Sequence, residues 1–316
     1  MTDLAELAVV ERDGFAESRH YGTLVALAAD GSVAFATGDP NAAILPRSSV
    51  KPWQAVACRS LGPELDDAGT AISAGSHTGE DAHVAVVRSI LASAGLDEDA
   101  LGCPADWPED EATRQRMSSR QTVRMNCSGK HAAMLAACVV QGWDTSSYLS
   151  PDHPVQQRVR SVLEEATGGP VTHVTTDGCG APLFGTTVFG LARAASRLVG
   201  ARAGSAERVV ADAMRAEPFY VGGTGHANTT LMQRVPGVVA KGGAEGVLMA
   251  AAADGRAVAM KVLDGSPRAT TMLAVAALAW LDVDTSGAGS LAGVPVLGGG
   301  RPVGRIRLGA DLRALQ

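Results

Sequence analysis

Lysine is scarce in this chain: only four of its 27 basic residues are lysines, and the rest are arginines. The four are Lys51, Lys130, Lys241 and Lys261, and their neighbours are mostly serine, glycine, cysteine or apolar residues. Arginine stays charged, whereas a lysine in a dry pocket can lose its proton and act as a base or a ligand. The placement therefore predicts lysine chemistry. Biased codon usage would explain the small number of lysines but not their positions.

Large excesses of one charge and long apolar runs are also absent. The net charge of -6 is spread over interspersed acids and bases, and without a Lys/Arg-rich stripe nucleic acid is an unexpected partner. The most apolar run, residues 272–283, contains Asp282 and is too short to cross a bilayer, so it predicts a buried helix and no membrane partner. The first ten residues are acidic, which predicts no signal peptide and a cytoplasmic location.

The chain has few cysteines for its length. Five is an odd number, and a chain of 316 residues that is 46% hydrophobic can build a core without disulfides, so we expect reduced thiols. Cys58 and Cys138 lie in segments with helical periodicity and apolar neighbours, which is typical of small core residues. Cys103, beside Pro104, belongs to no motif.

Strand patterns occupy both ends of the sequence, and helical periodicity fills the middle. We therefore expect an α/β (α+β) fold in which strands from both ends pair in one largely antiparallel sheet, with helices on its faces. Residues 1–316 are predicted to form a single domain, with residues 102–121 as a surface excursion. Strands are expected at 7–10, 22–28, 32–36, 235–240, 257–262, 294–297 and 303–308, and helices within 51–101, 131–141 and 155–166.

A serine and a lysine three residues apart precede the first helical pattern. Ser48 is expected near a helix N-terminus with Lys51 one turn later on the same face, so that hydroxyl and amine meet. A desolvated lysine with a lowered pKa can take the serine proton, as in the Ser-Lys arrangement of serine β-lactamases and penicillin-binding proteins. The spacing alone also arises by chance.

Two further segments suggest the same chemistry. An ordinary helix N-terminus capped by Thr78 would explain the acids after it, but not the preceding Ser76 and His77. Lys241 ends a predicted strand and is followed by glycines that would let a substrate approach the backbone. It resembles the Lys-Thr-Gly strand of the β-lactamase fold, with Gly242 in place of threonine, although a simple turn is the other interpretation.

A third cluster contains thiols. Cys127 lies in the string Asn-Cys-Ser-Gly-Lys-His, and Cys179 lies between two glycines about fifty residues later. Two thiolates with a nearby imidazole or neutral amine would suit Zn²⁺. The spacing matches no zinc-finger pattern, and both segments could be tight loops.

Seven short segments follow one another along nearly the whole chain: Glu17-Ser18-Arg19-His20, Arg47-Ser48-Ser49-Val50-Lys51-Pro52, Ser76-His77, Asn126 to His131, Asp152-His153-Pro154, Asp177-Gly178-Cys179 and Ala240-Lys241-Gly242. Together they resemble the asparaginase II family, the rhizobial-type L-asparaginases. The Asn-Cys-Ser-Gly-Lys-His string is the most specific of them. Chance resemblance at so many positions in order is implausible.

This resemblance implies a serine β-lactamase/glutaminase-like sandwich and the hydrolysis of L-asparagine to L-aspartate and ammonia. It also implies a homodimer, because family members of this kind form one. The residues that it implies are two Ser-Lys pairs, Ser48 with Lys51 and Ser76 with Lys241, and a zinc ion held by Cys127, Lys130 and Cys179. Where the family has an arginine-containing stretch, this chain has His226 and Asn228. The departure affects the contact that the family would make with the substrate carboxylate.

The expected mechanism is attack by Ser48 on the side-chain amide, with Lys51 as base and backbone N–H groups near Ser48 as oxyanion donors. Ser76 and Lys241 would relay a proton to the leaving ammonia. Arg47, His77, Asp177 and His131 are the predicted substrate-binding residues, and for Asp177 a turn residue is an equal alternative.

Two other functions remain open from the sequence. One is a glutaminase or another acyl hydrolase of the β-lactamase fold, because one methylene changes binding by only about 1–3 kcal/mol. The other is a non-catalytic zinc-binding or amino-acid-binding protein. The two intact Ser-Lys pairs argue against a binding module.

Overall fold

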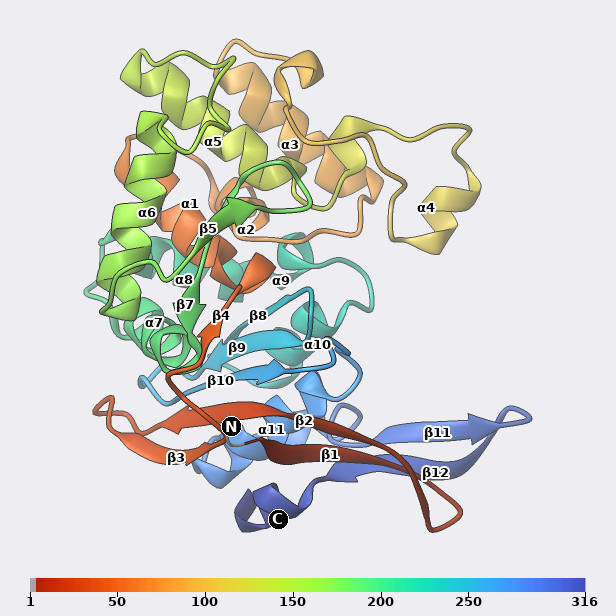
Figure 1. The fold of residues 1–316 in the computed structure, drawn as a ribbon. Coiled ribbons are helices and arrows are strands. Elements are labelled where there is room, and N and C mark those ends of the chain that lie inside the picture. Colours follow the sequence, from red (N-terminus) through yellow and green to blue (C-terminus); the bar gives the residue numbers. More distant parts are fainter. Residues whose placement is uncertain (1–3, 316) are drawn as a thin grey trace.

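The computed structural model describes residues 4–315, which are built around an eight-stranded antiparallel sheet (Figure 1). Seven strands follow the order β11, β12, β1, β2, β10, β9 and β8, and β3 also pairs with β2. Helices cover this sheet, so the predicted α/β class with a largely antiparallel sheet is confirmed. Its strands are β1 (Ala5–Arg12), β2 (Phe15–Leu27), β3 (Val33–Thr37), β8 (Val239–Gly243), β9 (Val247–Ala251), β10 (Ala257–Val262), β11 (Val294–Gly298) and β12 (Arg301–Leu308).

The two ends of the chain share this sheet. Strand β1 lies between β2 and β12, with Val10 opposite Ser18 on one side and Ile306 on the other. Figure 1 shows the red N-terminal strands beside the blue C-terminal ones. Val9 and Val10 are buried, as suits branched side chains in a central strand. The predicted pairing of the terminal strands is confirmed.

The middle of the chain is mainly helical, as predicted. Helices α7 and α11 pack against strands β9 and β10. Helix α11 corresponds to the buried helix predicted at 272–283, and no helix within residues 4–315 is long and apolar enough to span a membrane. The helices are α1 (Lys51–Ser60), α2 (Asp67–Ser73), α3 (Asp81–Ser93), α4 (Glu111–Gln115), α5 (Ser128–Gln141), α6 (Pro154–Thr167), α7 (Val188–Gly200), α8 (Ala206–Ala216), α9 (Pro218–Val221), α10 (Ala227–Arg234) and α11 (Thr270–Trp280).

Some boundaries differ from the predictions. The strand expected at 235–240 begins only at Val239, because α10 ends at Arg234 and Pro236 and Gly237 form a turn. Two small sheets were not predicted: β4 (Ala43–Ile44) pairs with β7 (Thr186–Thr187), and β5 (Val174–Thr176) pairs with β6 (Pro182–Phe184). Strands of two or three residues are too short to show an alternating pattern.

The cysteines are buried, and no disulfide joins them within the described chain. Cys58 and Cys138 lie in the hydrophobic core, as predicted. Burial raises the pKa of Cys58 to about 12 and that of Cys138 to about 11, so both are protonated and unreactive.

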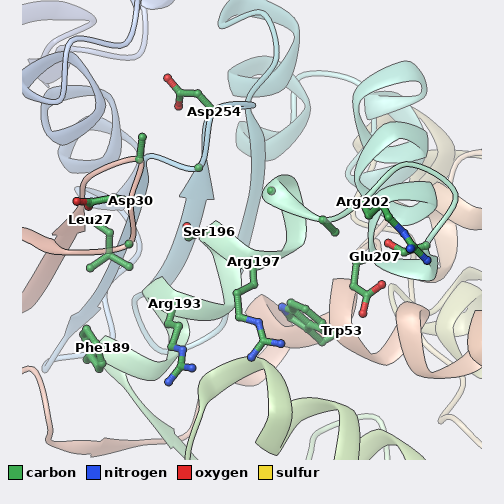
Figure 2. Close-up of a pocket in the computed structure, with 16 residues that line it drawn as sticks. Leu27, Asp30, Trp53, Phe189, Arg193, Ser196, Arg197, Arg202, Glu207 and Asp254 are labelled. Carbon is green, nitrogen blue, oxygen red and sulfur yellow. The ribbon is translucent and has the colours of Figure 1, made fainter.

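A cavity of about 850 Å³ lies beside Trp53 of α1 and the C-terminal half of α7 (Figure 2). Two of its arginines have a structural role. Arg197 donates a hydrogen bond to the Glu165 carbonyl, and the Arg193 guanidinium packs closely on Gly168. Both cations therefore stabilise the C-terminal end of α6, where unpaired carbonyls favour positive charge. No predicted site residue lines this cavity, and all of those residues lie in the described part of the chain.

Candidate active site

Two buried lysine amines contact the hydroxyl of Ser76. The distance from Nζ to Ser76 Oγ is 2.9 Å for Lys51 and 2.9 Å for Lys241. Lys51 also donates to the carbonyl of Gly75 at 2.7 Å, and Lys241 donates to that of Gly242 at 2.6 Å. Each lysine is 1% exposed. The serine is therefore held between two amines whose remaining protons are directed at backbone carbonyls.

Three separate elements bring these groups together. Lys51 is the first residue of α1, and Lys241 is the middle residue of β8. Ser76 lies in the extended segment between α2 and α3, where its N–H donates to the Val221 carbonyl at 2.9 Å. Gly75 permits this contact, because a Cβ there would lie 2.6 Å from the Tyr220 carbonyl oxygen. The sequence spacing of the three residues gives no indication of this contact.

The electrostatics of the pair favour one neutral amine. Burial and the positive charge of Lys51 hold the pKa of Lys241 well below its usual value. Two ammonium groups in contact with one oxygen would repel each other strongly at this buried position. Lys241 is thus the amine that gives up its proton, and its lone pair can accept the proton of Ser76.

Ser48 lies in the same cavity but does not meet Lys51 as predicted. It belongs to a 3₁₀ turn, Arg47–Val50, that leads into α1. Among the described residues the Ser48 hydroxyl has no hydrogen-bond partner, whereas the Lys51 amine is directed at Gly75, Ser76 and, at 3.3 Å, the Asn126 carbonyl. These three acceptors come from other segments of the chain and fix the direction of the amine. Ser48 and Lys51 are therefore neighbours in sequence, and among the described contacts their side chains share no hydrogen bond.

The cavity has a volume of about 410 Å³, a size typical of small-molecule sites. Ser48, Ser76 and Lys241 all line it. Strand β8 approaches the Ser48 turn so closely that a Cβ on Gly243 would lie 3.1 Å from the Ser48 nitrogen. The cavity is also lined by six polar residues that were not predicted as site residues: Glu109, Asn126, His226, Asn228, Thr270 and Thr271.

Glu109 comes from the loop predicted as a surface excursion. Figure 1 shows that this loop projects from the helical layer and carries α4. Glu109, two residues before the start of α4, lines the cavity. Glu109 Oε1 accepts a hydrogen bond from Asn126 Nδ2 at 2.8 Å. No spacing rule connects residue 109 with the Ser-Lys segments, so only the folded loop reveals it. Asn126 could have been found, since it begins the Asn-Cys-Ser-Gly-Lys-His string.

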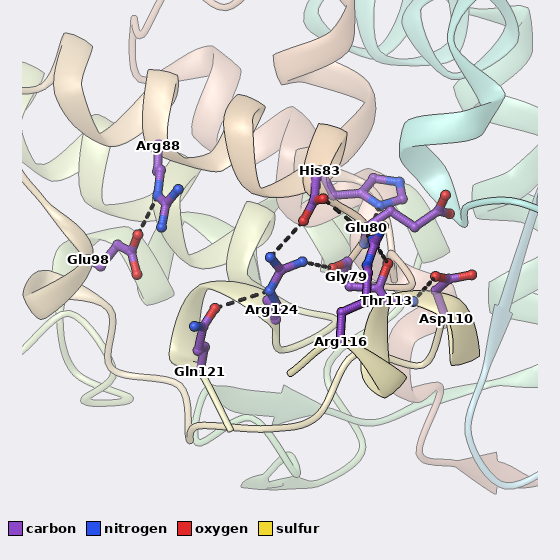
Figure 3. Close-up of polar contacts among 11 residues, drawn as sticks. Gly79, Glu80, His83, Arg88, Glu98, Asp110, Thr113, Arg116, Gln121 and Arg124 are labelled. Carbon is purple, nitrogen blue, oxygen red and sulfur yellow. Dashed lines mark hydrogen bonds and ion pairs between the residues drawn. The ribbon is translucent and has the colours of Figure 1, made fainter. Parts of the chain in front are cut away.

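A polar network holds two loops of the cavity in place (Figure 3). Arg124 donates to the Gly79 carbonyl and to Asp81, both at 2.7 Å, which joins the base of the 102–121 loop to the start of α3. Glu80, the N-cap of α3, accepts hydrogen bonds from the Thr224 N–H at 2.8 Å and from its hydroxyl at 2.9 Å. Thr78 is therefore not the cap that was predicted. The start of α3 positions both Glu109 and the 222–228 segment.

The three predicted metal ligands lie together next to this cavity. Cys127 is the N-cap of α5, Lys130 lies in its first turn, and Cys179 lies in the turn between β5 and β6. The distance from Lys130 Nζ to Cys179 Sγ is 3.0 Å, and all three residues are buried. A hydrogen bond from Cys179 and the charges of Lys51 and Lys130 hold the pKa of Cys127 well below its usual value, although burial opposes them.

The four predicted substrate-binding residues do not line the cavity. Arg47 Nε donates to Asp177 Oδ1 at 2.8 Å, so these two residues tie the Ser48 turn to the turn that carries Cys179. His77 and His131 are fully buried; His77 Nε2 lies 2.9 Å from Ser128 Oγ, and His131 Nδ1 lies 2.6 Å from the Tyr148 hydroxyl. All four residues therefore brace the segments that carry the site.

A sequence model of the family described as L-asparaginase II matches residues 8–308 of this chain. Among curated proteins, none matches the sequence.

Solved structures resemble the chain at low sequence identity. A Bacillus glutaminase solved with 4.3 M NaCl is 13% identical with a TM-score of 0.46, and the match covers 83% of this chain and 91% of that one. A β-lactamase from Mycobacterium bovis is 16% identical with a TM-score of 0.44, and covers 82% and 94%. For the protein Mglu in its native form with 4.3 M NaCl the identity is 11%, the TM-score is 0.47, and the coverage is 84% and 61%.

The close approach of β8 to the Ser48 turn can be tested with Gly243→Ala. The added Cβ would lie 2.8 Å from the Pro46 carbonyl oxygen, so the turn must shift relative to Ser76 and Lys241. We expect turnover to fall roughly 100-fold, since a misplacement of about 1 Å has that effect on catalysis. Gly293→Ala, where the Cβ meets open space, is the control. Equal activities of the two variants in steady-state assays would contradict the prediction.

Proposed function

Because the chain belongs to the L-asparaginase II family, a family of amidohydrolases, we propose that it hydrolyses L-asparagine to L-aspartate and ammonia. The observation that carries the proposal is the hydrogen-bonded series Lys51, Ser76 and Lys241, which ends in a cavity beside the free hydroxyl of Ser48. A nucleophile and a path for its proton are what acyl transfer requires.

In the proposed first step, the proton of Ser48 moves along this series. Neutral Lys241 accepts the Ser76 proton, Ser76 takes one from the Lys51 ammonium, and Lys51 then accepts the proton of Ser48. The Ser48 oxygen forms a bond to the side-chain amide carbon of the substrate. The N–H of Ser48, beside the end of β8, is the proposed oxyanion donor.

Collapse of the tetrahedral intermediate breaks the bond to the amide nitrogen. Lys51 returns a proton to that nitrogen, which leaves as ammonia, and the aspartyl group stays esterified to Ser48. Water then attacks this ester, and the same series takes the water proton and restores the Ser48 hydroxyl. In each half of the reaction the three residues first remove a proton from the attacking hydroxyl or water and then return a proton to the leaving group, as general acid–base catalysis requires.

Cys127, Lys130 and Cys179 fit the zinc ion that was predicted. The set contains two buried sulfurs, one of them a thiolate, and an amine in contact with the other sulfur. Zinc is commonly bound by thiolates. Although burial opposes it, the neighbouring Cys127 and Cys179 raise the pKa of Lys130, so this ammonium would have to give up a proton to become the third ligand. When bound, the ion would supply a fixed positive charge beside the cavity. The residues also join α5 to the β5–β6 turn.

The preference for asparagine over glutamine rests on one methylene, so both amides belong in every assay. A binding protein without turnover, the other candidate, would contain metal and release no ammonia. The homodimer and the cytoplasmic location stay predictions.

The nucleophile can be identified with Ser48→Ala and Ser76→Ala. We expect Ser48→Ala to lower ammonia release by roughly 10⁴-fold or more, because the acyl group then has no acceptor. Ser76→Ala should lower it by about 10²- to 10⁴-fold, since only proton transfer is impaired. Hydroxylamine added during turnover should form aspartyl hydroxamate, and mass spectrometry should find the aspartyl adduct on the Ser48 peptide. An adduct on the Ser76 peptide would show that Ser76, and not Ser48, is the nucleophile.

The proton acceptor can be tested by pH dependence. Lys241 must be neutral, so kcat/KM should rise with pH through its pKa, which burial and Lys51 hold well below the usual 10.5. The negative charge of Glu109 raises that pKa. Glu109→Gln should therefore shift the rising limb to lower pH, whereas Lys241→Arg, which stays charged, should be inactive throughout. A limb that does not move in Glu109→Gln would contradict this assignment.

The metal can be tested by elemental analysis. We expect about one zinc ion per purified chain, and Cys127→Ser and Lys130→Met should retain little after dialysis because a ligand is lost. Cys138→Ala is the matched control, because this cysteine is buried in α5 outside the cluster. Equal zinc contents in all these proteins would show that the cluster is not the binding site.

A further inference from the structure

The cavity carries little charge. Of the residues that line it, only Glu109, Lys241 and His226 can ionise. Burial is the main reason why the pKa of His226 falls to about 4, so this imidazole is neutral at physiological pH. Lys241 is the neutral member of the lysine pair. Glu109 is therefore the one fixed charge among the described residues of the lining.

Asn228 supplies a hydrogen-bond donor that no described group uses. The residue is 3% exposed, and its Oδ1 accepts the N–H of Gly242 at 2.9 Å. This bond assigns the amide orientation, because an N–H must face the oxygen. Nδ2 is left buried without an acceptor. An unsatisfied buried donor carries a desolvation cost, which a hydrogen bond to a substrate oxygen would offset.

The backbone holds Asn228 rigidly. Its N–H donates to Nδ1 of His226, the N-cap of α10, at 3.1 Å. Gly242, its side-chain partner, directly follows Lys241 in β8. The free donor is therefore fixed relative to the Ser76 amines by one strand and one helix end, as a specificity contact requires.

Glu109 supplies a negatively charged hydrogen-bond acceptor, in contrast to the donor of Asn228. One carboxylate oxygen accepts the Asn126 hydrogen bond, and Oε2 has no hydrogen-bond partner within residues 4–315. The base of the Glu109 loop is held by the Arg124 contacts shown in Figure 3. A carboxylate that is positioned in this way attracts an ammonium group.

We propose that Asn228 Nδ2 binds the α-carboxylate and Glu109 the α-ammonium of a free amino-acid amide. The reacting carbonyl must lie at Ser48, so the α-carboxylate is the remaining oxygen group of such a substrate. The inference rests on the proposed function and gives the substrate class: both ends of the amino acid are free, and asparagine within a peptide is rejected. Because Asn228 is neutral, the carboxylate is bound by a hydrogen bond rather than by an ion pair.

The test pairs variants with truncated substrates. β-Alaninamide is L-asparagine without its α-carboxylate, and succinamic acid is L-asparagine without its α-amino group. A variant that removes a contact should lose selectivity for the group contacted, because that group no longer has a partner. All values of kcat/KM are measured at a pH on the plateau of each variant's pH profile, so that changes in the pKa of Lys241 do not affect the ratios.

For Asn228→Ala and Asn228→Asp, the kcat/KM ratio of L-asparagine to β-alaninamide should fall at least about tenfold, the usual effect of losing a hydrogen bond to a charged group. The Asp variant keeps an acceptor for the Gly242 N–H, which separates the role of Nδ2 from that of Oδ1. For Glu109→Gln, the ratio of L-asparagine to succinamic acid should fall by a similar factor. Gly293→Ala, outside the cavity and with open space around the added Cβ, is the control and should keep the wild-type ratios.

Two outcomes would overturn the inference and leave the proposed function intact: unchanged ratios, or equal losses on all three amides. Release of no ammonia from any amide by the wild-type protein would overturn the proposed function instead. In that case thermal shifts with L-aspartate, β-alanine and succinate decide the inference. L-Aspartate should then raise the Tm of the wild type more than either truncated acid does, and the variants should lose that difference; equal shifts would overturn the inference.

Discussion

The contact of one serine oxygen with two buried lysines is the constraint on which the site depends. Two ammonium groups repel each other strongly at this buried position, and burial with this repulsion makes Lys241 the neutral one. The protons of both amines need acceptors, and the carbonyls of Gly75 and Gly242 provide them. The Gly75 carbonyl lies in the α2–α3 segment, so its hydrogen bond ties that segment to α1, whereas the Gly242 carbonyl belongs to the same strand as Lys241.

Asn126 connects the lysine pair to the rest of the site. Its carbonyl accepts from Lys51 at 3.3 Å, its side chain holds Glu109, and the next residue is Cys127 of the thiol cluster. The same short segment thus touches the proton path, the charged end of the cavity and the three candidate ligands. The peptide unit between Asn126 and Cys127 therefore lies between the thiol cluster and the Lys51 amine.

The buried histidines and the Arg47–Asp177 ion pair show why motif residues need not contact substrate. His77 and His131 are each bound to a neighbouring hydroxyl behind the cavity. Arg47 joins the Ser48 turn to the turn of Cys179 through Asp177. Residues of this kind stand next to the reactive residues in sequence because they hold the same backbone. Their type therefore indicated the location of the site but not their own role.

The sequence by itself determined the antiparallel sheet shared by both chain ends, the helical middle and the family, because these depend on local periodicity and on ordered motifs. It also identified Ser48, Ser76 and both lysines. Only the tertiary structure decided that Lys51 is directed at Ser76 rather than at Ser48, since three acceptors from distant segments attract its amine. It also decided that Glu109 and Asn228 line the cavity. Loop 102–121 and helix α10 carry no periodic signal for this contact, which arises only when α3, α10 and β8 pack together.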